Sequence, residues 1–398
     1  MKRAALWLAL LCGSAAAAPD EVAYGRDDGY PAGDRTSFMQ QRHMVGAFSA
    51  MRSLLPVRAV PAGTALRPLA PHPAAGEAAR DWRFVDAYLD SHPATGLIVL
   101  QDGKLLLERY QYGRNAQQLL TSWSMAKTVV AMAVGIAVAE GRIASIDDPL
   151  DKYEPFLANS AWKGISIRHA LNMASGVKFD ETYNVPGNDI AVFSRPWSRH
   201  EGSFQDVLQN FKQTEAAPGD RFKYISSDTQ ALAQALVKAV GRPLADYVSE
   251  KLWAPMGAEA DAEWLIDARG MEAAYCCLNA RLRDWARLGQ LLLDGGARDG
   301  RQIVPTGWVE AATAVRFRDG HLQPKRATPY FGYGYQTWIF PDQLGFALQG
   351  VRGQAVFVHP RLKLVMVQTA VWTPDRNAEF GRQRDQFWRE LVQRAARL

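Results

Sequence analysis

Three pairs of serine and lysine, each spaced three residues apart, are the first candidates for chemistry in this sequence. They are Ser124/Lys127, Ser160/Lys163 and Ser175/Lys178. On a helix this spacing puts a hydroxyl and an amine on one face, one turn apart. The lysine can then take the proton of a serine nucleophile, provided that burial lowers its pKa and populates the neutral amine.

The residues around each pair favour the first one. Ser124 and Lys127 head an uncharged apolar stretch, residues 128–134, in which a lysine is costly unless it has a task. The second pair is followed by Gly164 in a polar loop, and the third contains Gly176 and reads as a turn. We therefore expect Ser124 to be a nucleophile and Lys127 its base.

A Ser–Lys pair needs a further group that carries the proton to the leaving group. Tyr224 and Ser226 form a Tyr-x-Ser sequence after Pro218-Gly219 and before a helix expected from Thr229. This places Tyr224 at a loop tip, where functional groups are often presented. We expect Tyr224 to shuttle the proton, with nearby cations lowering its pKa.

Other catalytic motifs are absent from the sequence. It contains no G-x-S-x-G, no H-E-x-x-H, no phosphate-binding G-x-x-x-x-G-K-[ST] and no G-x-G-x-x-G after a strand. Its seven histidines are scattered without ligand spacing. We therefore expect neither a metal site nor a cofactor.

Three motifs in order resemble the serine β-lactamase and penicillin-binding-protein superfamily. They are Ser124-x-x-Lys127, the Pro-Gly-x-x-x-x-Tyr-x-Ser sequence that ends at Ser226, and Gly350 to Gln354 before a strand hairpin. Further stretches at 167–176, 179–183, 276–284 and 332–336 resemble its class C-like branch, which includes esterases and 6-aminohexanoate-dimer hydrolases. The resemblance covers roughly residues 95–395.

The resemblance implies a role for individual residues. Ser124 would be acylated, Lys127 would activate it, and Tyr224 would protonate the leaving group, with Ser226 in the third position of the second motif. The backbone N–H groups of Ser124 and Gln354 would form an oxyanion hole. Gly353 would allow close approach of the strand. Apart from the resemblance, we expect the aromatic residues near the proposed cleft, Tyr183, Trp197 and Trp338, to line an acyl pocket.

The third motif departs from that of true β-lactamases. They begin it with a lysine that helps to bind the substrate carboxylate, whereas this chain has Val351 there. Arg352 is the nearby cation, and on a regular strand it would face the opposite side. We therefore expect an acyl-enzyme hydrolase of small amides or esters. A β-lactamase or D-alanyl-D-alanine carboxypeptidase, and a non-catalytic peptidoglycan-binding module, remain as alternatives.

The composition limits the function classes. The chain has 398 residues, 48% hydrophobic and 22% charged, and 46 Lys and Arg against 41 Asp and Glu give a net charge of +5. Because no basic run concentrates this small excess, we expect a small-molecule substrate and no nucleic-acid partner. The oligomeric state stays open.

A bridge between Cys276 and Cys277 would close no loop, so we expect two semi-buried thiols.

The N-terminus has the pattern of a signal peptide, residues 1–17. Lys2 and Arg3 precede a short apolar stretch, and small residues follow, with cleavage expected after Ala17. The protein would then be periplasmic or secreted. The later apolar stretch 128–139 is too short for a stable membrane span.

The pattern of elements predicts an α/β (α+β) fold. Strands expected near both ends would form one antiparallel sheet flanked by helices, with a mostly helical region inserted, as in β-lactamases and transpeptidases. We expect a proline-rich extended arm at 18–76, a sheet-containing domain from 77–150 and 330–398, and a mostly helical domain at 151–329. The expected helices are 77–90, 124–140, 229–240, 244–252, 282–293 and 387–398, and the expected strands are 97–100, 104–110, 333–340, 346–349, 354–358 and 362–369.

Overall fold

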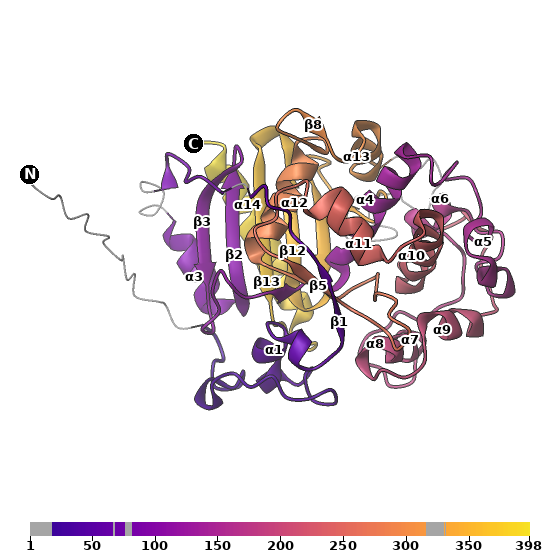
Figure 1. Ribbon diagram of the computed structural model, residues 1–398. Helices are drawn as coiled ribbons and strands as arrows, with labels where there is room; N and C mark the ends of the chain where they lie inside the picture. Colours follow the sequence, from indigo (N-terminus) through magenta and orange to yellow (C-terminus); the bar gives the residue numbers. More distant parts are fainter. Residues whose placement is uncertain (1–17, 67, 76–81, 316–329, 331) are drawn as a thin grey trace, which may run out of the picture.

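The computed structural model describes residues 18–66, 68–75, 82–315, 330 and 332–398 (Figure 1). The expected signal peptide, the start of the helix expected at residue 77 and the boundary expected at 329 lie outside these residues. Within the described ranges, no helix combines the length and the apolar character needed to cross a bilayer.

A seven-stranded sheet forms the centre of the fold, with strand order β3-β2-β13-β12-β11-β10-β9. Every neighbouring pair in it is antiparallel. The expected α/β fold with an antiparallel sheet built from distant parts of the chain is therefore confirmed. The strands are β2 (Ala94–Gln101), β3 (Lys104–Tyr110), β9 (Gly332–Tyr333), β10 (Trp338–Ile339), β11 (Phe346–Gly350), β12 (Gln354–His359) and β13 (Leu364–Ala370).

The alternation of side chains along each strand gives the sheet two buried faces. In β2, Leu97 and Val99 pack with α3 (Arg83–Ser91) and α14 (Asn377–Ala395) on one face. Ile98 and Leu100 belong to the larger core on the other face, which α12 (Leu282–Leu293) covers. Both faces are apolar, so helices shield the sheet on both sides.

The first hairpin of the sheet has the turn that its sequence predicts. Asp102 and Gly103 join β2 to β3 with φ values of 50° and 71°. Positive φ at both central positions is the type I′ geometry that Asp-Gly favours. The hairpin expectation is confirmed.

Helices occupy most of the middle of the chain and gather beside one edge of the large sheet (Figure 1). They include α4 (Ala126–Ala139), α5 (Leu150–Tyr153), α6 (Ile167–Leu171), α7 (Asp189–Phe193), α8 (Arg195–Ser198), α9 (Phe204–Asn210), α10 (Ser226–Val240), α11 (Leu244–Val248) and α13 (Thr306–Ala312). A small sheet with order β1-β5-β6-β4 links this region to the N-terminal part; its strands are β1 (Val57–Val60), β4 (Leu120–Thr121), β5 (Ala262–Leu265) and β6 (Leu278–Ala280).

The N-terminal part is more ordered than the extended arm expected at 18–76. It contains α1 (Gln41–Ala47), and β1 pairs with β5. Met44 is buried, and the buried Tyr24 donates from its hydroxyl to the carbonyl of Val371 at 2.6 Å. The prolines in the second half of the segment dominated the expectation, whereas apolar residues in the first half pack into the main core.

Two helices begin earlier than their apolar period predicts. α10 begins at Ser226 instead of residue 229, and α14 begins at Asn377 instead of residue 387. In both cases the first turns are rich in polar residues, which carry little hydrophobic periodicity. The early start of α10 places Ser226 at a helix N-terminus.

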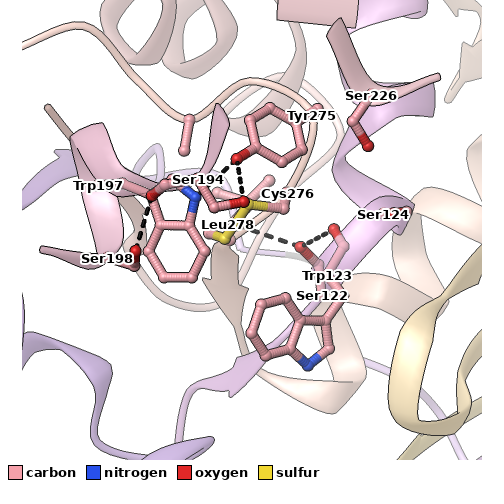
Figure 2. Close-up of a disulfide and its surroundings, with 12 residues drawn as sticks. Ser122, Trp123, Ser124, Ser194, Trp197, Ser198, Ser226, Tyr275, Cys276 and Leu278 are labelled. Atoms are coloured by element: carbon pink, nitrogen blue, oxygen red, sulfur yellow. Dashed lines mark hydrogen bonds between the residues drawn. A yellow bond between two sulfur atoms is a disulfide. The ribbon is translucent and has the colours of Figure 1, made fainter. Parts of the chain in front are cut away.

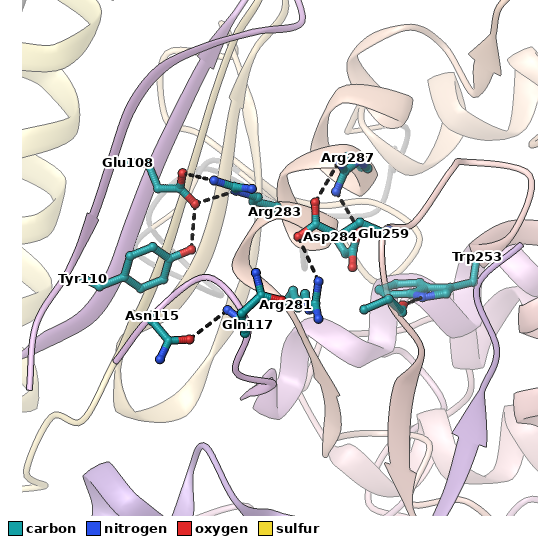
Figure 3. A network of polar contacts seen from close by, with 11 residues as sticks. Glu108, Tyr110, Asn115, Gln117, Trp253, Glu259, Arg281, Arg283, Asp284 and Arg287 are labelled. Carbon is teal, nitrogen blue, oxygen red and sulfur yellow. Dashed lines mark hydrogen bonds and ion pairs between the residues drawn. The ribbon is translucent and has the colours of Figure 1, made fainter. Parts of the chain in front are cut away.

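Charged side chains fasten α12 to the elements around it (Figure 3). Arg283 donates to both carboxylate oxygens of Glu108 on β3, at 2.8 and 2.7 Å. Arg287 donates to Asp284 at 2.8 Å and to Glu259 at 3.0 Å. The side chains of Arg287 and Asp284 are only 5% and 0% exposed, so this cation compensates carboxylates that water cannot reach.

The first prediction concerns this buried cation. Arg287→Ala should lower the free energy of unfolding by about 3–5 kcal/mol, because it leaves the carboxylate of Asp284, whose side chain is 0% exposed, without this cation. Arg42→Ala, which removes an exposed pair with Asp28, is the control and should cost about 1 kcal/mol or less. Urea unfolding followed by circular dichroism measures both. Equal losses for the two variants would contradict the assignment.

Candidate active site

Ser124 lies in a single 3-10 turn, Trp123–Met125, that leads directly into α4. The turn follows β4, and Trp123 has a φ of 43°, so the chain bends sharply before the serine. The turn packs against the end of β11, where a Cβ on Gly350 would lie 2.4 Å from the carbonyl oxygen of Ser122. Glycine at position 350 therefore allows the serine turn to lie against the large sheet.

The first of the three Ser-x-x-Lys pairs is the one whose two side chains meet. The Nζ of Lys127 lies 2.9 Å from the Oγ of Ser124, and Lys127 is 1% exposed. Lys163 and Lys178 are both exposed at the surface, where Lys178 donates to Gln213. The apolar context predicted this difference, because the helix that follows Ser124 is buried along most of its length.

Three oxygen atoms surround the amine of Lys127. Besides Ser124 Oγ, they are Ser226 Oγ at 3.1 Å and the backbone carbonyl of Tyr275 at 2.8 Å. The rings of Tyr224 and Tyr275 flank the nitrogen at 5.0 and 5.4 Å from their centroids. The amine is thus enclosed by aromatic rings and contacted by few polar groups.

A carboxylate sets the direction of the hydrogen bonds around Lys127. Glu181 accepts from the Oγ of Ser226 at 2.5 Å and from its backbone N–H at 2.9 Å. An ionised carboxylate can only accept, so the Ser226 hydroxyl gives its proton to Glu181 and must accept from Lys127. The Tyr275 carbonyl is also an acceptor only. Two N–H bonds of Lys127 are therefore assigned, and the third position of the nitrogen faces Ser124.

Burial lowers the pKa of Lys127 to about 7, and the charge of Glu181 opposes this shift. A substantial fraction of the lysine is therefore neutral near pH 7. In the neutral amine the two N–H bonds serve Ser226 and Tyr275, so that the lone pair points at the Ser124 hydroxyl. This geometry suits a general base.

Tyr224 lies in the segment just before α10, with its ring next to the amine of Lys127. Its ring stacks on Trp338 of β10, with centroids 5.4 Å apart. Burial, followed by the charge of Glu181, raises the pKa of Tyr224, and a hydrogen bond with Ser124 opposes the rise. The expectation that cations lower this pKa is wrong, because burial and the charge of Glu181 raise it. The phenol keeps its proton and can donate it.

The third motif is a turn between β11 and β12. Val351–Gly353 forms one 3-10 turn in which Arg352 has a φ of 65° and Gly353 a φ of 95°. The alternation of a regular strand therefore does not apply at Arg352. Its guanidinium donates to the side-chain oxygen of Asn184 at 3.0 Å, and the residue is 8% exposed. Arg352 joins two loops of the site.

Gly353 and Gln354 lie beside the serine turn through the pairing of Gln354 with Gly350. The Gln354 side chain points inward: its amide donates to the carbonyl of Ala370 at 2.7 Å and accepts from the N–H of the same residue at 3.0 Å. A Cβ on Gly353 would lie 2.3 Å from the ring of Trp372, so glycine is also needed for packing there.

The aromatic residues expected to line the pocket have different surroundings. Tyr183 is 39% exposed, and its hydroxyl donates to Glu181 at 2.6 Å. Trp338 contacts Tyr224, as described above. Trp197 is 4% exposed, and its indole donates to the Tyr275 hydroxyl at 2.7 Å, so it supports Tyr275 from within the core.

Cys276 and Cys277 are joined in a disulfide, next to Tyr275 (Figure 2). The expectation of two thiols is wrong. That expectation was based on the small restriction that such a bridge places on the unfolded chain, whereas the bridge also restricts the local backbone of the folded chain.

Two groups of the site were missed by the sequence-based assignment. Glu181 occurs in a stretch that resembles the family, but 45 positions separate it from Ser226, and no short motif joins them. The carbonyl of Tyr275 is a backbone group, which carries no residue signature. The resemblance of residues 179–183 to the family was the feature of the sequence that could have pointed to Glu181.

Comparison with known proteins assigns the family. The family described as Beta-lactamase matches residues 83–386, and the chain belongs to it. The chain is 28% identical over 359 residues to a 6-aminohexanoate-dimer hydrolase of Paenarthrobacter ureafaciens, covering 88% of this chain and 91% of the relative. The enzyme is thus a hydrolase of the serine β-lactamase superfamily, for which a Ser-Lys-Tyr mechanism is typical, as its motifs predict.

Solved structures confirm the fold. A putative 6-aminohexanoate-dimer hydrolase from Bacillus anthracis superposes with a TM-score of 0.73 at 22% identity, covering 89% of this chain and 96% of the other. A putative β-lactamase from Bacteroides dorei superposes with a TM-score of 0.58 at 19% identity, covering 74% and 90%. The expected β-lactamase-like architecture is confirmed.

The second prediction follows from the pKa of Lys127. Only the neutral amine accepts a proton, so kcat/KM for an ester should rise with pH through a limb near pH 7 and then level off. Hydrolysis of p-nitrophenyl butyrate from pH 5 to 9 measures the limb. A rate that showed no limb near pH 7 and was still rising at pH 9 would mean that Lys127 stays charged.

The third prediction concerns Glu181. Its charge raises the pKa of Lys127, so Glu181→Gln should move the same limb to lower pH. Glu215→Gln, which changes a carboxylate paired with Lys223 at the surface, is the matched control and should leave the limb in place. A limb that moved to higher pH in Glu181→Gln would contradict the electrostatic assignment.

Proposed function

We propose that this member of the Beta-lactamase family is an exported serine hydrolase that forms an acyl-enzyme on Ser124 from small amides or esters. The observation that carries the proposal is the hydrogen-bonded chain from Glu181 through Ser226 to Lys127, whose amine lies 2.9 Å from the nucleophile. A non-catalytic module that only bound peptidoglycan would not require a buried amine next to a serine hydroxyl.

Acylation follows from the placement of these groups. The amine of Lys127 takes the proton of Ser124 as Oγ attacks the substrate carbonyl carbon. The backbone N–H groups of Ser124 and Gln354 donate hydrogen bonds to the carbonyl oxygen and stabilise the negative charge that develops on it. Tyr224 gives its phenolic proton to the leaving nitrogen or oxygen, and the protonated Lys127 returns a proton to Tyr224.

Deacylation uses the same groups in reverse. A water molecule takes the place of the leaving group beside Tyr224 and Lys127, which remove one of its protons as it attacks the ester carbon. The acid product departs, and the proton returns to Ser124. One proton-transfer chain therefore serves both half-reactions, as microscopic reversibility favours.

The substrate preference rests on the third motif and on the aromatic residues. Arg352 is engaged with Asn184 and lies in a buried turn, which leaves Val351 where β-lactamases have the carboxylate-binding lysine. Tyr183, Tyr224 and Trp338 suit an uncharged acyl chain. The name of the relative, 6-aminohexanoate-dimer hydrolase, supports linear amides as one substrate class.

Export is the part of the proposal that rests on residues 1–17 alone. Their charged start, apolar stretch and small residues are typical of a signal peptide. Sequencing of the mature N-terminus from a periplasmic extract tests it, and a chain that retained Met1 would contradict it.

The fourth prediction tests the catalytic pair. Ser124→Ala should abolish labelling by a fluorophosphonate while the circular dichroism spectrum stays unchanged. Lys127→Arg keeps the charge but cannot lose its proton, so acylation should fall by at least about 100-fold. Intact-mass analysis with mapping of the modified serine measures both, and Ser160→Ala is the control. A label that mapped to Ser160 or Ser175 would overturn the assignment.

The fifth prediction tests the substrate class. A charge-assisted hydrogen bond to the substrate carboxylate would raise kcat/KM about 10- to 150-fold, and this chain lacks the lysine that makes it in β-lactamases. We therefore expect p-nitrophenyl butyrate to be a better substrate than nitrocefin. A linear 6-aminohexanoate dimer tests the amide arm.

Arg352→Ala distinguishes the alternatives in the same assay, with the exposed Arg361→Ala as control. The expected result is an unchanged ratio of ester to nitrocefin activity. If nitrocefin were the better substrate and Arg352→Ala removed that activity alone, the protein would be a β-lactamase.

A further inference from the structure

The Cys276–Cys277 disulfide lies between two backbone contacts to the nucleophile region. On one side, the carbonyl of Tyr275 accepts a hydrogen bond from Lys127 at 2.8 Å. On the other side, Leu278 exchanges hydrogen bonds with Ser122, two positions before Ser124: its N–H donates to Ser122 Oγ, and its carbonyl accepts from the Ser122 N–H, each at 3.1 Å (Figure 2). The two cysteines thus lie between Tyr275, which binds the amine of Lys127, and Leu278, which binds the turn that carries Ser124.

We propose that the Cys276–Cys277 disulfide is a positioning element of the catalytic site, which holds the Tyr275 carbonyl against the amine of Lys127. The proposal rests on the acyl-enzyme chemistry proposed at Ser124, and it is independent of which amide or ester is the substrate.

The local backbone explains why a bridge between neighbours has this effect. The disulfide closes a small ring that contains the Cys276–Cys277 peptide bond, so the dihedral angles on both sides of that bond cannot vary independently. Cys277 has a φ of 69°, a left-handed value that a non-glycine residue rarely adopts. The Tyr275 carbonyl belongs to the peptide unit bonded to the Cα of Cys276, which is a ring atom, so a change in the ring shifts the point from which this unit extends.

Contacts around the pair anchor other atoms of the segment. The Tyr275 hydroxyl is held by Trp197 and Ser194, and the carbonyl of Cys276 accepts from the indole of Trp264 at 2.8 Å. Both cysteines are buried, at 4% and 0% exposure. These contacts fix the phenol ring and the second carbonyl, and the disulfide adds a second covalent connection within the segment between them and β6, which starts at Leu278.

The orientation of the Lys127 amine depends on this carbonyl. A neutral amine has two N–H bonds, and Ser226 and the Tyr275 carbonyl take one each, which leaves the lone pair for Ser124. Without the carbonyl, the amine can rotate and its lone pair loses its fixed direction. The titratable side chains that face Lys127 in the described part of the chain are Glu181, Tyr224 and Tyr275. Opening the ring adds two thiols, Cys276 and Cys277, to the segment that carries the Tyr275 carbonyl, and the unbridged variant described below lacks both of them.

Opening the ring requires a reductant. A dithiol such as dithiothreitol supplies two electrons and two protons: the S–S bond breaks, two thiols form, and the dithiol becomes a cyclic disulfide. An oxidising compartment, where the proposed export would place the chain, keeps the bond closed.

The test compares the oxidised and reduced full-length protein. The rate constant for fluorophosphonate labelling of Ser124 and kcat/KM for p-nitrophenyl butyrate are measured from pH 5 to 9, with reduction verified by intact mass and folding by circular dichroism. Reduction should lower both rates about 10- to 100-fold on the plateau, because the base is no longer aligned. The acidic limb should also move to lower pH, because an acceptor of the ammonium protons is lost.

Two variants separate this effect from general destabilisation. Cys12 belongs to the expected signal peptide, so the comparison is repeated on a chain that starts at residue 18 and has Cys276 and Cys277 as its cysteines. Its sensitivity to dithiothreitol should be the same. Cys276→Ala/Cys277→Gly keeps the left-handed backbone accessible without the bond, so it provides a folded, unbridged protein if the reduced wild type unfolds. It should show the slower labelling and the shifted limb, and dithiothreitol should not affect it.

The outcomes are distinct. Equal rates and limbs in the bridged and unbridged proteins would overturn the proposal, and so would a loss of rate with an unmoved limb, which indicates a structural role alone. If the oxidised protein were not labelled at Ser124 at all, the proposed acyl-enzyme function would itself fail, and the positioning role with it.

Discussion

The site depends on one physical constraint, which is that a buried amine has few ways to satisfy its hydrogen bonds. Lys127 lies on an apolar helix between two tyrosine rings, so its charge is poorly solvated and its pKa falls to about 7. The oxygens that remain within reach are Ser124, Ser226 and the Tyr275 carbonyl. Since Glu181 makes Ser226 an acceptor, the surroundings of the lysine determine where its lone pair points.

The fold supplies these groups from distant parts of the chain. The serine turn lies against the end of β11 because Gly350 has no side chain, and α4 buries the lysine one turn later. Ser226 enters at the N-terminus of α10, and Glu181 reaches it from the loop before α7. The large sheet, shielded on both faces, provides a rigid support on which the helical region places these residues.

The features that depend on residues close together in the sequence were predictable from it. The Ser-x-x-Lys spacing, the apolar helix after it, the Asp102-Gly103 hairpin and most of the strands follow from short-range geometry. The strand expected at 333–340 is instead two short strands, Gly332–Tyr333 and Trp338–Ile339, which pair with each other. Glu181 and the Tyr275 carbonyl were not predictable in this way, since one acts across 45 positions and the other is a backbone atom. The packed segment before residue 66 was missed because its buried residues join the main core without following a regular apolar period in the sequence.

The neutral state of Lys127 is the central claim, and it can be measured directly. In protein labelled with 13C at the lysine ε-carbon, the resonance of Lys127 can be assigned by its loss in Lys127→Arg and followed from pH 5 to 11. The account predicts a titration centred near pH 7. A resonance that titrated near 10.5, the ordinary value for a lysine, would contradict it, because the amine would then be charged throughout the working range.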